Sequence, residues 1–583
     1  MRGLLQFQHR YAIPCAMKTD ILNLLTAIHF FSMAGLAVYG LHRIWMIFCW
    51  LKPQPVSRHS VPSFGKADDM PAVTVQIPLY NEPLVAGRII DAVSAFDWPV
   101  EKLEIQVLDD STDETRDIVV ERVAFWSANG RGIHVIARKH RTGFKAGALA
   151  YGLRQAKGDY IAVFDADFAP YPDFLKKMMP HFTRPEIGMV QARWGFLNAG
   201  RSWLTRLQSM LLSAHFGIEH TVRCNRGLFF NFNGTAGIWR KSAIVSSGGW
   251  QSDTVTEDLD LSYRAQLAGW RFVYVHDVVA LSELPMTLSD FRIQQERWSK
   301  GAIQTARKLL PEIFTAKASL AVKVEAAAHL LANCCWVFGF IATITLYPVL
   351  LNRAGIGVYQ IIWVDLPLFF LTSVAVLVYY CIHGWHSRRN PALSALPFLP
   401  AASIGLAPFF SLAVMKGLFQ KGGMFARTPK FGIQDSMPAR MPHIRVHPHV
   451  LTNLLMNIPL FLYTLAPVWF AWGRETWPAI PFLCLFPAGF ALVISHDLHE
   501  VIFAANGGIY APSFAWPYSC RQMTCQYLHA DENQEHAADK FHPGAEFFSE
   551  IFSGPDAHSR KNSCDDADHN AGLPDANVDH GKT

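Results

Sequence analysis

A pair of acidic residues stands where a predicted β-strand ends. The strand covers residues 160–164, and Asp165-Ala166-Asp167 follows it directly. Because side chains alternate along a strand with a period of two, Asp165 and Asp167 are expected to point to the same side. Carboxylate oxygens at this separation suit Mg²⁺ or Mn²⁺, which share their coordination with substrate phosphates. The pattern indicates a site for a nucleoside diphosphate leaving group, whose developing charge such a cation neutralises.

A second acidic pair, Asp109–Asp110, follows the predicted strand at 105–108. Taken alone, each pair is more simply explained as a turn or a helix cap, in which a carboxylate accepts backbone hydrogen bonds. Two such pairs at the ends of successive strands favour a binding site instead. In open α/β sheets, ligands bind beyond the carboxyl ends of the strands.

A third acidic cluster, at 256–260, lies where a helix is predicted to begin. Leu259, Tyr263 and Leu267 follow at helical spacing, which places Asp258 near the helix N-terminus. The simplest role for Asp258 is capping and compensation of the helix dipole. The alternative is a general base that removes a proton from an acceptor hydroxyl. Inverting displacement at an anomeric carbon needs one such base opposite the leaving group.

Two basic segments complete the candidate chemistry. The segment 141–147 is basic and flanked by glycine, which suits approach to a pyrophosphate, although a solvated loop is a fair competitor. In the segment 294–298, Arg297 offers a fork for a diphosphate and Trp298 a face for a sugar ring. A Trp–Arg pair at a membrane interface is the simpler explanation when this segment is considered alone.

The elements that must position these residues form an α/β domain. Short β-branched runs alternate with helix-like segments between residue 51 and about residue 325, and no run there is long enough to cross a membrane. The predicted strands are 73–77, 105–108, 133–136 and 160–164. Strands separated by helices favour a mostly parallel sheet with crossover helices.

The composition indicates that another part of the chain lies in lipid. Only 17% of the 583 residues are charged and 51% are hydrophobic, whereas soluble domains carry about 25% charged residues. Apolar runs of bilayer length occur at 22–50, 326–351, 358–382, 393–415, 451–472 and 478–496. The ten cysteines form no CxxC pair and the net charge of +5 comes without a Lys/Arg tract. We therefore predict neither a zinc site nor a disulfide framework, and no nucleic-acid partner.

The charge of the loops sets the expected topology. The loop at 416–445 is basic and is expected on the cytoplasmic side, as is a domain that uses nucleotide-sugars. Two spans between them satisfy both conditions, so the proline-containing run 393–415 is interpreted as interfacial or re-entrant. The predicted parts are an N-terminal segment (1–21), a transmembrane helix (22–50), the α/β domain with interfacial helices (51–325), two transmembrane helices (326–382), the interfacial or re-entrant segment with a loop (383–450), two transmembrane helices (451–496) and a polar, disordered tail (497–583).

In chain order, these motifs resemble the family 2 glycosyltransferases of the cellulose-synthase superfamily. That pattern is an Asp-Asp pair, Asp-x-Asp, Thr-Glu-Asp and Gln-x-x-Arg-Trp, found here at 109–110, 165–167, 256–258 and 294–298. The segment 425–430 also resembles the gating loop of bacterial cellulose synthases. The resemblance implies a GT-A-type nucleotide-sugar-binding domain inserted between transmembrane helices of a polytopic membrane protein.

Within the superfamily, the chain is most similar to the plant cellulose-synthase-like A group of mannan and glucomannan synthases, and to the related C group. The likeness covers about residues 70–310 and is carried by the segments 107–113, 143–149, 164–168, 190–194, 232–239 and 282–285. Glu296 and Lys300 depart from it, because the plant group has His and Cys there. These positions flank the acceptor site, so the transferred sugar stays open.

The resemblance also implies residue roles. The nucleotide-sugar would contact Asp109, Asp110, Lys145, Asp165 and Arg297. Asp165 and Asp167 would bind the metal, Mg²⁺ or Mn²⁺, and Asp258 would be the catalytic base. The acceptor would contact Phe232, Asn233, Gly234, Thr235, Glu257, Gln294, Gln295 and Trp298. The gating-like loop would act through Phe425, Thr428 and Lys430.

The leading expectation is a metal-dependent hexosyltransferase of the inner (plasma) membrane with a cytoplasmic catalytic domain. It would be processive and inverting, polymerising a β-1,4-mannan, glucomannan or glucan from GDP-mannose or UDP-glucose and moving the growing β-glycan across the membrane. Membrane lipids are expected partners, and accessory export proteins are candidates. The alternative is a non-processive enzyme that glycosylates a lipid or a polyprenyl phosphate. A transporter is disfavoured because the acidic clusters lie outside the spans, and an inactive scaffold because all four motifs are intact.

Overall fold

The computed structural model describes residues 15–52, 69–353, 360–387, 391–424, 427–432 and 449–505. Several expectations lie outside these residues: most of the segment 1–21, Phe425 of the gating-like loop, and the tail beyond residue 505. The first part of the predicted tail is described, and it continues the last helix to Ala505.

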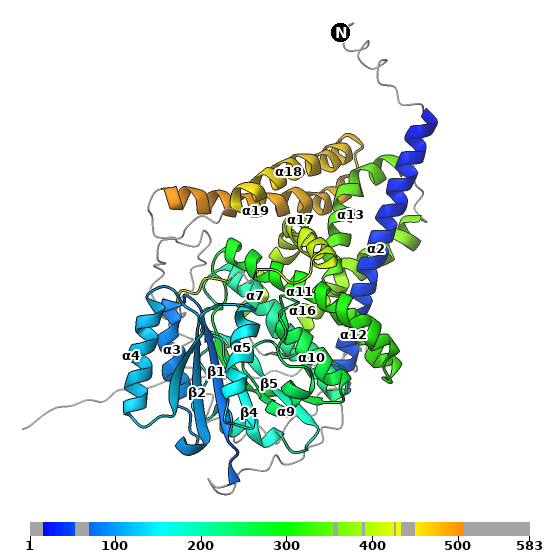
Figure 1. Ribbon diagram of the computed structural model, residues 1–583. Coiled ribbons are helices and arrows are strands. Elements are labelled where there is room, and N and C mark those ends of the chain that lie inside the picture. The colour runs from blue at the N-terminus through cyan, green and yellow to red at the C-terminus, as the bar shows by residue number, and fades with distance from the viewer. Residues whose placement is uncertain are drawn as a thin grey trace, which may run out of the picture. The chain divides into compact units, whose positions relative to one another are not determined.

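A seven-stranded mixed sheet forms the centre of the α/β domain (Figure 1). Its strand order is β3-β2-β1-β4-β6-β5-β7. The strands are β1 (Val73–Leu79), β2 (Leu103–Asp109), β3 (Ile133–Ala137), β4 (Tyr160–Val163), β5 (Ile187–Phe196), β6 (Gly237–Arg240) and β7 (Arg271–Ser282). Of the pairings, only those of β6 with β4 and β5 are antiparallel. The predicted mostly parallel sheet is confirmed.

Helices cover both faces of the sheet because the strands alternate their apolar side chains between two cores. In β2, Ile105 and Val107 join the core under α3 (Pro83–Ser94) and α4 (Thr115–Ala128). Leu108 faces the opposite core, under α5 (Phe144–Gln155). This double burial is the physical reason for the near-continuous hydrophobic runs of the strands.

Further helices connect the sheet to the apolar part of the chain. These are η2 (Val100–Lys102), α6 (Phe174–Met178), η3 (Met179–His181), α7 (Trp203–Ala214), η4 (His215–His220), α8 (Thr221–Asn225), α9 (Lys241–Ser246), α10 (Glu257–Leu267), α11 (Leu288–Thr315) and α12 (Leu320–Leu330). Ser202 caps α7 in a reciprocal capping box with Thr205, and Thr287 caps α11. The helix α7 continues into α8 through η4, which is a single π-helical turn.

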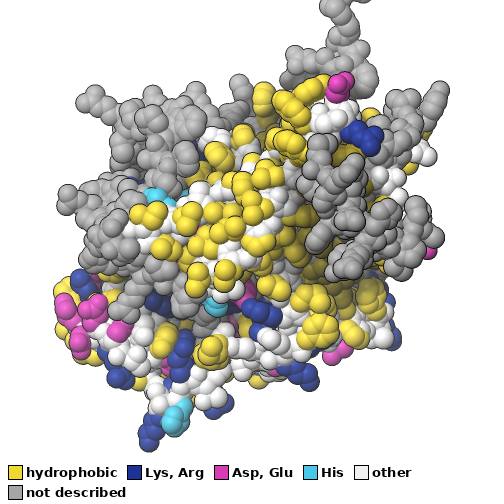
Figure 2. Space-filling model, turned by 90° about the horizontal axis from the view of Figure 1, so that it is seen from above, with side chains coloured by type: hydrophobic (Ala, Val, Ile, Leu, Met, Phe, Trp, Pro, Cys, Tyr) yellow, Lys and Arg dark blue, Asp and Glu magenta, His cyan; other side chains and the backbone are white. Residues whose placement is uncertain are grey.

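Six helices among the described residues are long and apolar enough to cross a membrane. They belong to α2 (Cys15–Leu51), α13 (Cys334–Asn352), the segment ending in α16 (Ala375–His386), α17 (Phe398–Phe419), α18 (His449–Gly473) and α19 (Ile480–Ala505). Short elements accompany them: η5 (Ile361–Asp365), α15 (Leu366–Phe369), η6 (Phe370–Val374), η7 (Pro391–Ala395) and η8 (Trp477–Ala479). Figure 2, seen from the side of α18 and α19, shows hydrophobic side chains over much of that face.

Two of these helices bear on the expected topology. The span predicted from residue 326 begins at Cys334, because 320–330 form the separate helix α12. The run interpreted as interfacial or re-entrant is the continuous helix α17, which packs against α11, α13 and α19. Its apolar window is 56% buried inside the protein, against 17–28% for the other five. Its relation to the bilayer stays a prediction.

Candidate active site

A solvent-open cleft with about 1070 Å³ of empty space lies beyond the carboxyl ends of β1, β2 and β4. Most of the residues predicted from the sequence line it together: Asp110, Lys145, Asp165, Asp167, Asn233, Gly234, Glu257, Asp258, Gln294, Arg297, Trp298, Thr428 and Lys430. The acidic residues meet because a sheet brings the ends of its parallel strands to one edge.

Four other predicted site residues do not line the cleft. Asp109 is buried, and its carboxylate accepts a hydrogen bond from the Ser111 amide at 2.9 Å. The Phe232 ring is fully buried in an aromatic core. Thr235 lies behind the cleft wall, and Gln295 is absent from the lining. The placement of these four residues does not support their predicted substrate contacts. Phe232 and Thr235 flank Asn233 and Gly234, which line the wall of the cleft.

Lys145 is held at the start of α5 between two groups that line the cleft. Its Nζ lies 2.5 Å from Asp165 Oδ1 and donates to the Gly234 carbonyl at 3.0 Å. Burial by itself lowers the pKa of Lys145, but the carboxylates of Asp165, Glu257 and Asp258 raise it above its ordinary value. Lys145 therefore carries a fixed positive charge that suits a diphosphate.

The turn that delivers Lys145 depends on a glycine. A Cβ at Gly147 would lie 2.0 Å from the Thr142 carbonyl oxygen, so no other residue fits there without moving the backbone. This close approach explains the glycine spacing of the segment 141–147.

Asp258 lies in the first turn of α10, where the chain passes tightly against Gly234. One carboxylate oxygen accepts a hydrogen bond from the Leu259 amide at 2.8 Å. Burial raises the pKa of Asp258, and it raises that of Glu257 to about 7, with a further contribution from the Asp258 charge. A raised pKa strengthens a carboxylate as a proton acceptor, which is what general-base chemistry requires.

Asp165 and Asp167 provide the hard oxygen ligands expected for a divalent cation. Asp165 donates its backbone N–H to the Thr235 hydroxyl at 2.9 Å, which fixes the turn after β4. Each carboxylate already attracts a positive group, Lys145 at Asp165 and Lys430 at Asp167 at 2.7 Å. No cluster of three or more His, Cys, Asp or Glu suitable for a metal occurs among the described residues. Two carboxylates at one strand end fit a cation that takes its remaining ligands from phosphate and water.

The described part of the gating-like loop, 427–430, reaches into the cleft, and residues 431 and 432 follow it. Besides the Lys430–Asp167 pair, the Phe431 amide donates to Glu283 at 2.8 Å. Arg427 lies 3.6 Å from Glu82. Burial of Lys430 lowers its pKa, but Asp167 outweighs this effect and raises it. These contacts tie the loop to the carboxyl-end edge of the sheet.

The cleft also contains Tyr80 and Glu82, which the sequence reasoning missed. Arg141 belongs to the predicted basic segment 141–147, and Arg138 holds Asp110 from outside the cleft lining. Glu82 follows β1 at a third strand end, and burial raises its pKa to about 7. The Arg141 guanidinium lies 3.4 Å from the centre of the Tyr80 ring. Arg138 binds Asp110 through Nε at 3.0 Å and through a second nitrogen. Applying the strand-end rule to β1 as well would have found Tyr80 and Glu82.

Gln294, Arg297 and Trp298 project from α11, and this helix is fixed to the apolar part of the chain. Arg292 binds Asp497 of α19 in a buried ion pair, at 2.5 Å and 3.1 Å for its two nitrogens. One turn away, the Ser289 hydroxyl donates to Glu500 at 2.5 Å. The wall of the cleft that carries Arg297 and Trp298 is thus built directly on a candidate membrane helix.

The sequence of the α/β domain is similar to that of known glycosyltransferases. Residues 71–301 match the family described as "Glycosyltransferase like family 2". The chain is 46% identical over 252 residues to the probable glucomannan 4-beta-mannosyltransferase 9 of Oryza sativa subsp. japonica, covering 42% of this chain and 48% of the relative. It is 44% identical over 279 residues to glucomannan 4-beta-mannosyltransferase 2 of Arabidopsis thaliana, covering 46% and 52%. The chain thus matches about half the length of these curated relatives.

Among solved structures, the chain is similar to a mannosyltransferase from Pyrobaculum calidifontis in complex with GDP-Man and Mn²⁺. The sequence identity is 21% and the TM-score 0.44, with 68% of this chain and 99% of that chain covered.

Proposed function

We propose that this chain, which carries a family 2 glycosyltransferase domain, is a processive, inverting enzyme that polymerises a β-linked polysaccharide from a nucleotide-sugar. One observation carries the proposal: Asp110, Asp167, Asp258 and Trp298 line the same cleft. The identity to glucomannan 4-beta-mannosyltransferases supports a β-1,4-mannan or glucomannan as product, with GDP-mannose as donor. UDP-glucose and a glucan remain the second choice.

In the proposed reaction, Asp258 removes the proton from an acceptor hydroxyl. The oxygen attacks the anomeric carbon of the donor sugar as the bond from that carbon to the diphosphate oxygen breaks. The nucleoside diphosphate leaves with the bonding electrons, and attack from the opposite side inverts the anomeric configuration. Lys145 and Arg297 bind the negative charge of the leaving group, and the Trp298 ring packs against the acceptor sugar.

A divalent cation, Mg²⁺ or Mn²⁺, is part of the proposal. Asp165 and Asp167 would hold it, since their oxygens suit such an ion and both carboxylates already face positive groups. When bound, it would neutralise charge on the diphosphate. Lys430 shares Asp167, so the loop and the cation would bind the same carboxylate.

The positions that depart from the plant pattern both contact the C-terminal end of α17, one in its last turn and one at the residue that follows it. Glu296 forms an ion pair with Lys416 at 2.6 Å, and Lys300 donates to the Gln420 side chain at 2.9 Å. We propose that these contacts set how the loop 427–432 approaches the cleft. The choice of sugar would then depend on the loop as well as on the cleft wall.

We further propose that the domain is cytoplasmic and that the protein lies in the inner (plasma) membrane. The six candidate spans and the anchoring of α11 on α19 support an exit for the growing β-glycan beside Trp298. Membrane lipids would be direct partners, and accessory export proteins would act downstream.

A donor screen on the purified membrane protein tests the proposal. GDP-mannose and UDP-glucose are supplied separately with Mg²⁺ or Mn²⁺, and the product is sized and digested with linkage-specific hydrolases. A long product cleaved by a β-1,4-mannanase is expected. A single sugar on a lipid would replace processive synthesis by the lipid-acceptor alternative, and no transfer from either donor would contradict the proposal.

A further inference from the structure

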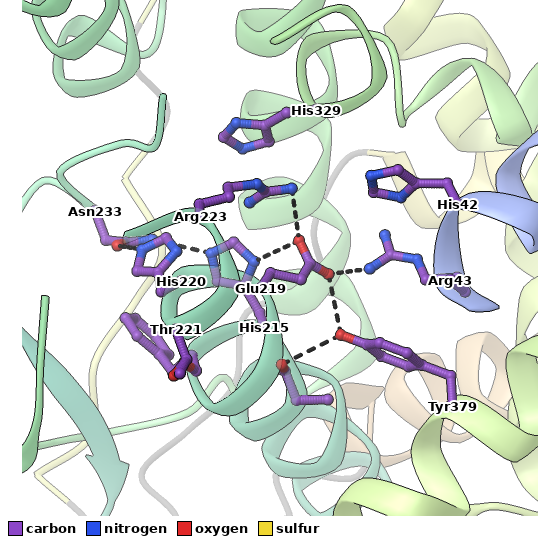
Figure 3. Close-up of polar contacts among 12 residues, drawn as sticks. His42, Arg43, His215, Glu219, His220, Thr221, Arg223, Asn233, His329 and Tyr379 are labelled. Atoms are coloured by element: carbon purple, nitrogen blue, oxygen red, sulfur yellow. Dashed lines mark hydrogen bonds and ion pairs between the residues drawn. The ribbon is translucent and has the colours of Figure 1, made fainter. Parts of the chain in front are cut away.

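A buried polar network lies directly behind Asn233, a residue of the cleft wall (Figure 3). It joins three parts of the chain that are far apart in the sequence: α2, the continuous pair η4 and α8, and α16. Its centre is the Glu219 carboxylate, and we refer to it as the Glu219 network. Its members are Arg43, His215, Glu219, His220, Arg223, Asn233 and Tyr379.

The Glu219 carboxylate is ionised. Burial tends to raise its pKa, but Arg43 and Arg223 hold it well below its ordinary value. Arg43 forms an ion pair with Oε1, and Arg223 lies 3.1 Å from Oε2. An ionised carboxylate accepts hydrogen bonds and donates none. Every group that contacts Glu219 must therefore offer a proton.

This requirement fixes the tautomer of His215. His215 Nδ1 lies 3.2 Å from Glu219 Oε2, so Nδ1 carries the proton. The other ring nitrogen, Nε2, faces the Asn233 amide nitrogen, which can only donate, so Nε2 presents its lone pair. It lies 3.4 Å from Asn233 Nδ2, from which it accepts a hydrogen bond.

His220 has the opposite arrangement. It is fully buried among Phe216, Phe230 and Tyr274, and burial lowers its pKa well below the ordinary value. The ring is therefore neutral. Its Nε2 lies 2.6 Å from Asn233 Oδ1, an acceptor, so Nε2 carries the proton and donates it.

The π turn is what places both histidines against one side chain. Residues five apart in an α-helix point about 140° away from each other at 3.6 residues per turn. In η4 the rings of His215 and His220 are 4.5 Å apart. Such π turns occur frequently at functional sites.

We propose that His215 and His220 are positioning residues that fix the Asn233 amide for hydrogen bonding to the acceptor sugar. His220 donates to the amide oxygen of Asn233, and His215 accepts from the amide nitrogen. If the amide were rotated by half a turn, both hydrogen bonds would be lost, because donor would face donor and acceptor would face acceptor. The fixed amide retains one N–H and one lone pair for a sugar hydroxyl. The next residue, Gly234, lies against Asp258, so Asn233 stands beside the proposed base. This inference rests on the proposed function.

A pair of variants at His220 separates positioning from packing. His220→Phe keeps an aromatic ring but removes the donor, and His220→Gln keeps an N–H at a similar reach. Transfer from GDP-mannose to a β-1,4-linked mannooligosaccharide is measured with GDP binding and thermal stability. Because His220→Phe loses one hydrogen bond to Asn233, we expect its acceptor kcat/KM to be about tenfold lower than that of the wild type. GDP binding is expected to be unchanged, and His220→Gln to recover most of the loss.

Two further variants protect the test against misfolding. His215→Asn keeps a donor toward Glu219 but removes the lone pair toward Asn233. It should lower acceptor kcat/KM while His220 keeps its ring contacts with Phe216, Phe230 and Tyr274. His329→Phe is the matched control. It removes another buried histidine, whose Nδ1 pairs with the Tyr263 hydroxyl at 2.8 Å and which forms no hydrogen bond with Asn233 in the described part of the structure. Its acceptor kcat/KM should equal that of the wild type.

Three results would overturn the inference. In the first, the acceptor kinetics of His220→Phe and His215→Asn equal those of the wild type. In the second, these variants lose GDP binding and acceptor kcat/KM to the same extent. In the third, the acceptor kcat/KM of His220→Gln is no higher than that of His220→Phe. In each of them the wild-type protein still extends the oligosaccharide. A wild-type protein that fails to extend it contradicts the proposed function itself, and this inference with it.

Discussion

Replacing Gly234 by alanine would place a methyl group against the proposed base. A Cβ at this position would lie 2.7 Å from Asp258 Oδ2 and 3.4 Å from Lys145 Nζ, and the backbone φ is +81°. Relieving the shorter contact to an ordinary carbon–oxygen separation needs a shift of about 0.7 Å. A misplacement of about 1 Å in a reacting group costs on the order of 100-fold in rate. We expect kcat to fall about 10- to 100-fold.

The positive φ also strains the backbone, by about 1–2 kcal/mol for a residue with a Cβ. Gly130 provides the control for this effect. Its φ is +80°, and nothing lies within 4 Å of its would-be Cβ. Gly130→Ala should therefore lower the thermal unfolding midpoint about as much as Gly234→Ala does, with kcat close to that of the wild type.

The assay is steady-state transfer from the donor found in the screen, with GDP or UDP binding measured in parallel. Nucleotide binding should survive in Gly234→Ala, because Asp110 lies at a different strand end. Equal kcat values for Gly234→Ala and Gly130→Ala would refute the assignment of Asp258 as the base. A loss of nucleotide binding in Gly234→Ala would show that the whole cleft had rearranged.

Three other predictions use different residues. Asp258→Asn should abolish turnover while nucleoside diphosphate binding stays largely intact, whereas Asp167→Ala should weaken the metal-dependent part of that binding in a titration with and without Mn²⁺. Burial raises the Glu257 pKa from 4.5 to about 7, so the folded state holds a proton there that the unfolded state loses first. Stability should therefore fall as pH rises from 4.5 to 7, and Glu257→Gln should flatten that part of the thermal unfolding profile. Arg292→Met should cost about 3–5 kcal/mol, because it leaves the Asp497 carboxylate buried and uncompensated, and the double variant with Asp497→Leu should recover much of that loss in detergent unfolding. A double variant less stable than Arg292→Met would contradict this account.

The acidic half of the cleft could be predicted from the sequence alone. Asp110, Asp165 and Asp167 follow strands, and a parallel sheet brings such positions to one edge whatever the connecting loops do. Glu82 obeys the same rule but was missed, because only strands followed by paired carboxylates were considered.

The other half of the cleft comes from segments with no local signal. Arg297, Trp298 and Lys430 reach it through long-range packing of α11 and the loop after α17. Residue type alone made Arg297 and Trp298 candidates, and only the resemblance to a known family pointed to Lys430. The Glu219 network could not be predicted from the sequence for a different reason. It depends on a π turn that aligns residues five apart, and neither helical nor strand periodicity predicts such a contact.

The ion pair between α11 and α19 has a consequence for biosynthesis. Asp497 and Glu500 are fully buried polar groups on a helix of otherwise apolar character, and an unpaired carboxylate in hydrocarbon is costly. Their partners, Arg292 and Ser289, belong to a helix of the catalytic domain that the ribosome completes much earlier. If α19 lies in the bilayer, it can pair these groups only against a catalytic domain that has already folded. Insertion of α19 would therefore depend on correct folding of the catalytic domain. Chains with a misfolded domain would stay incompletely inserted and would be degraded.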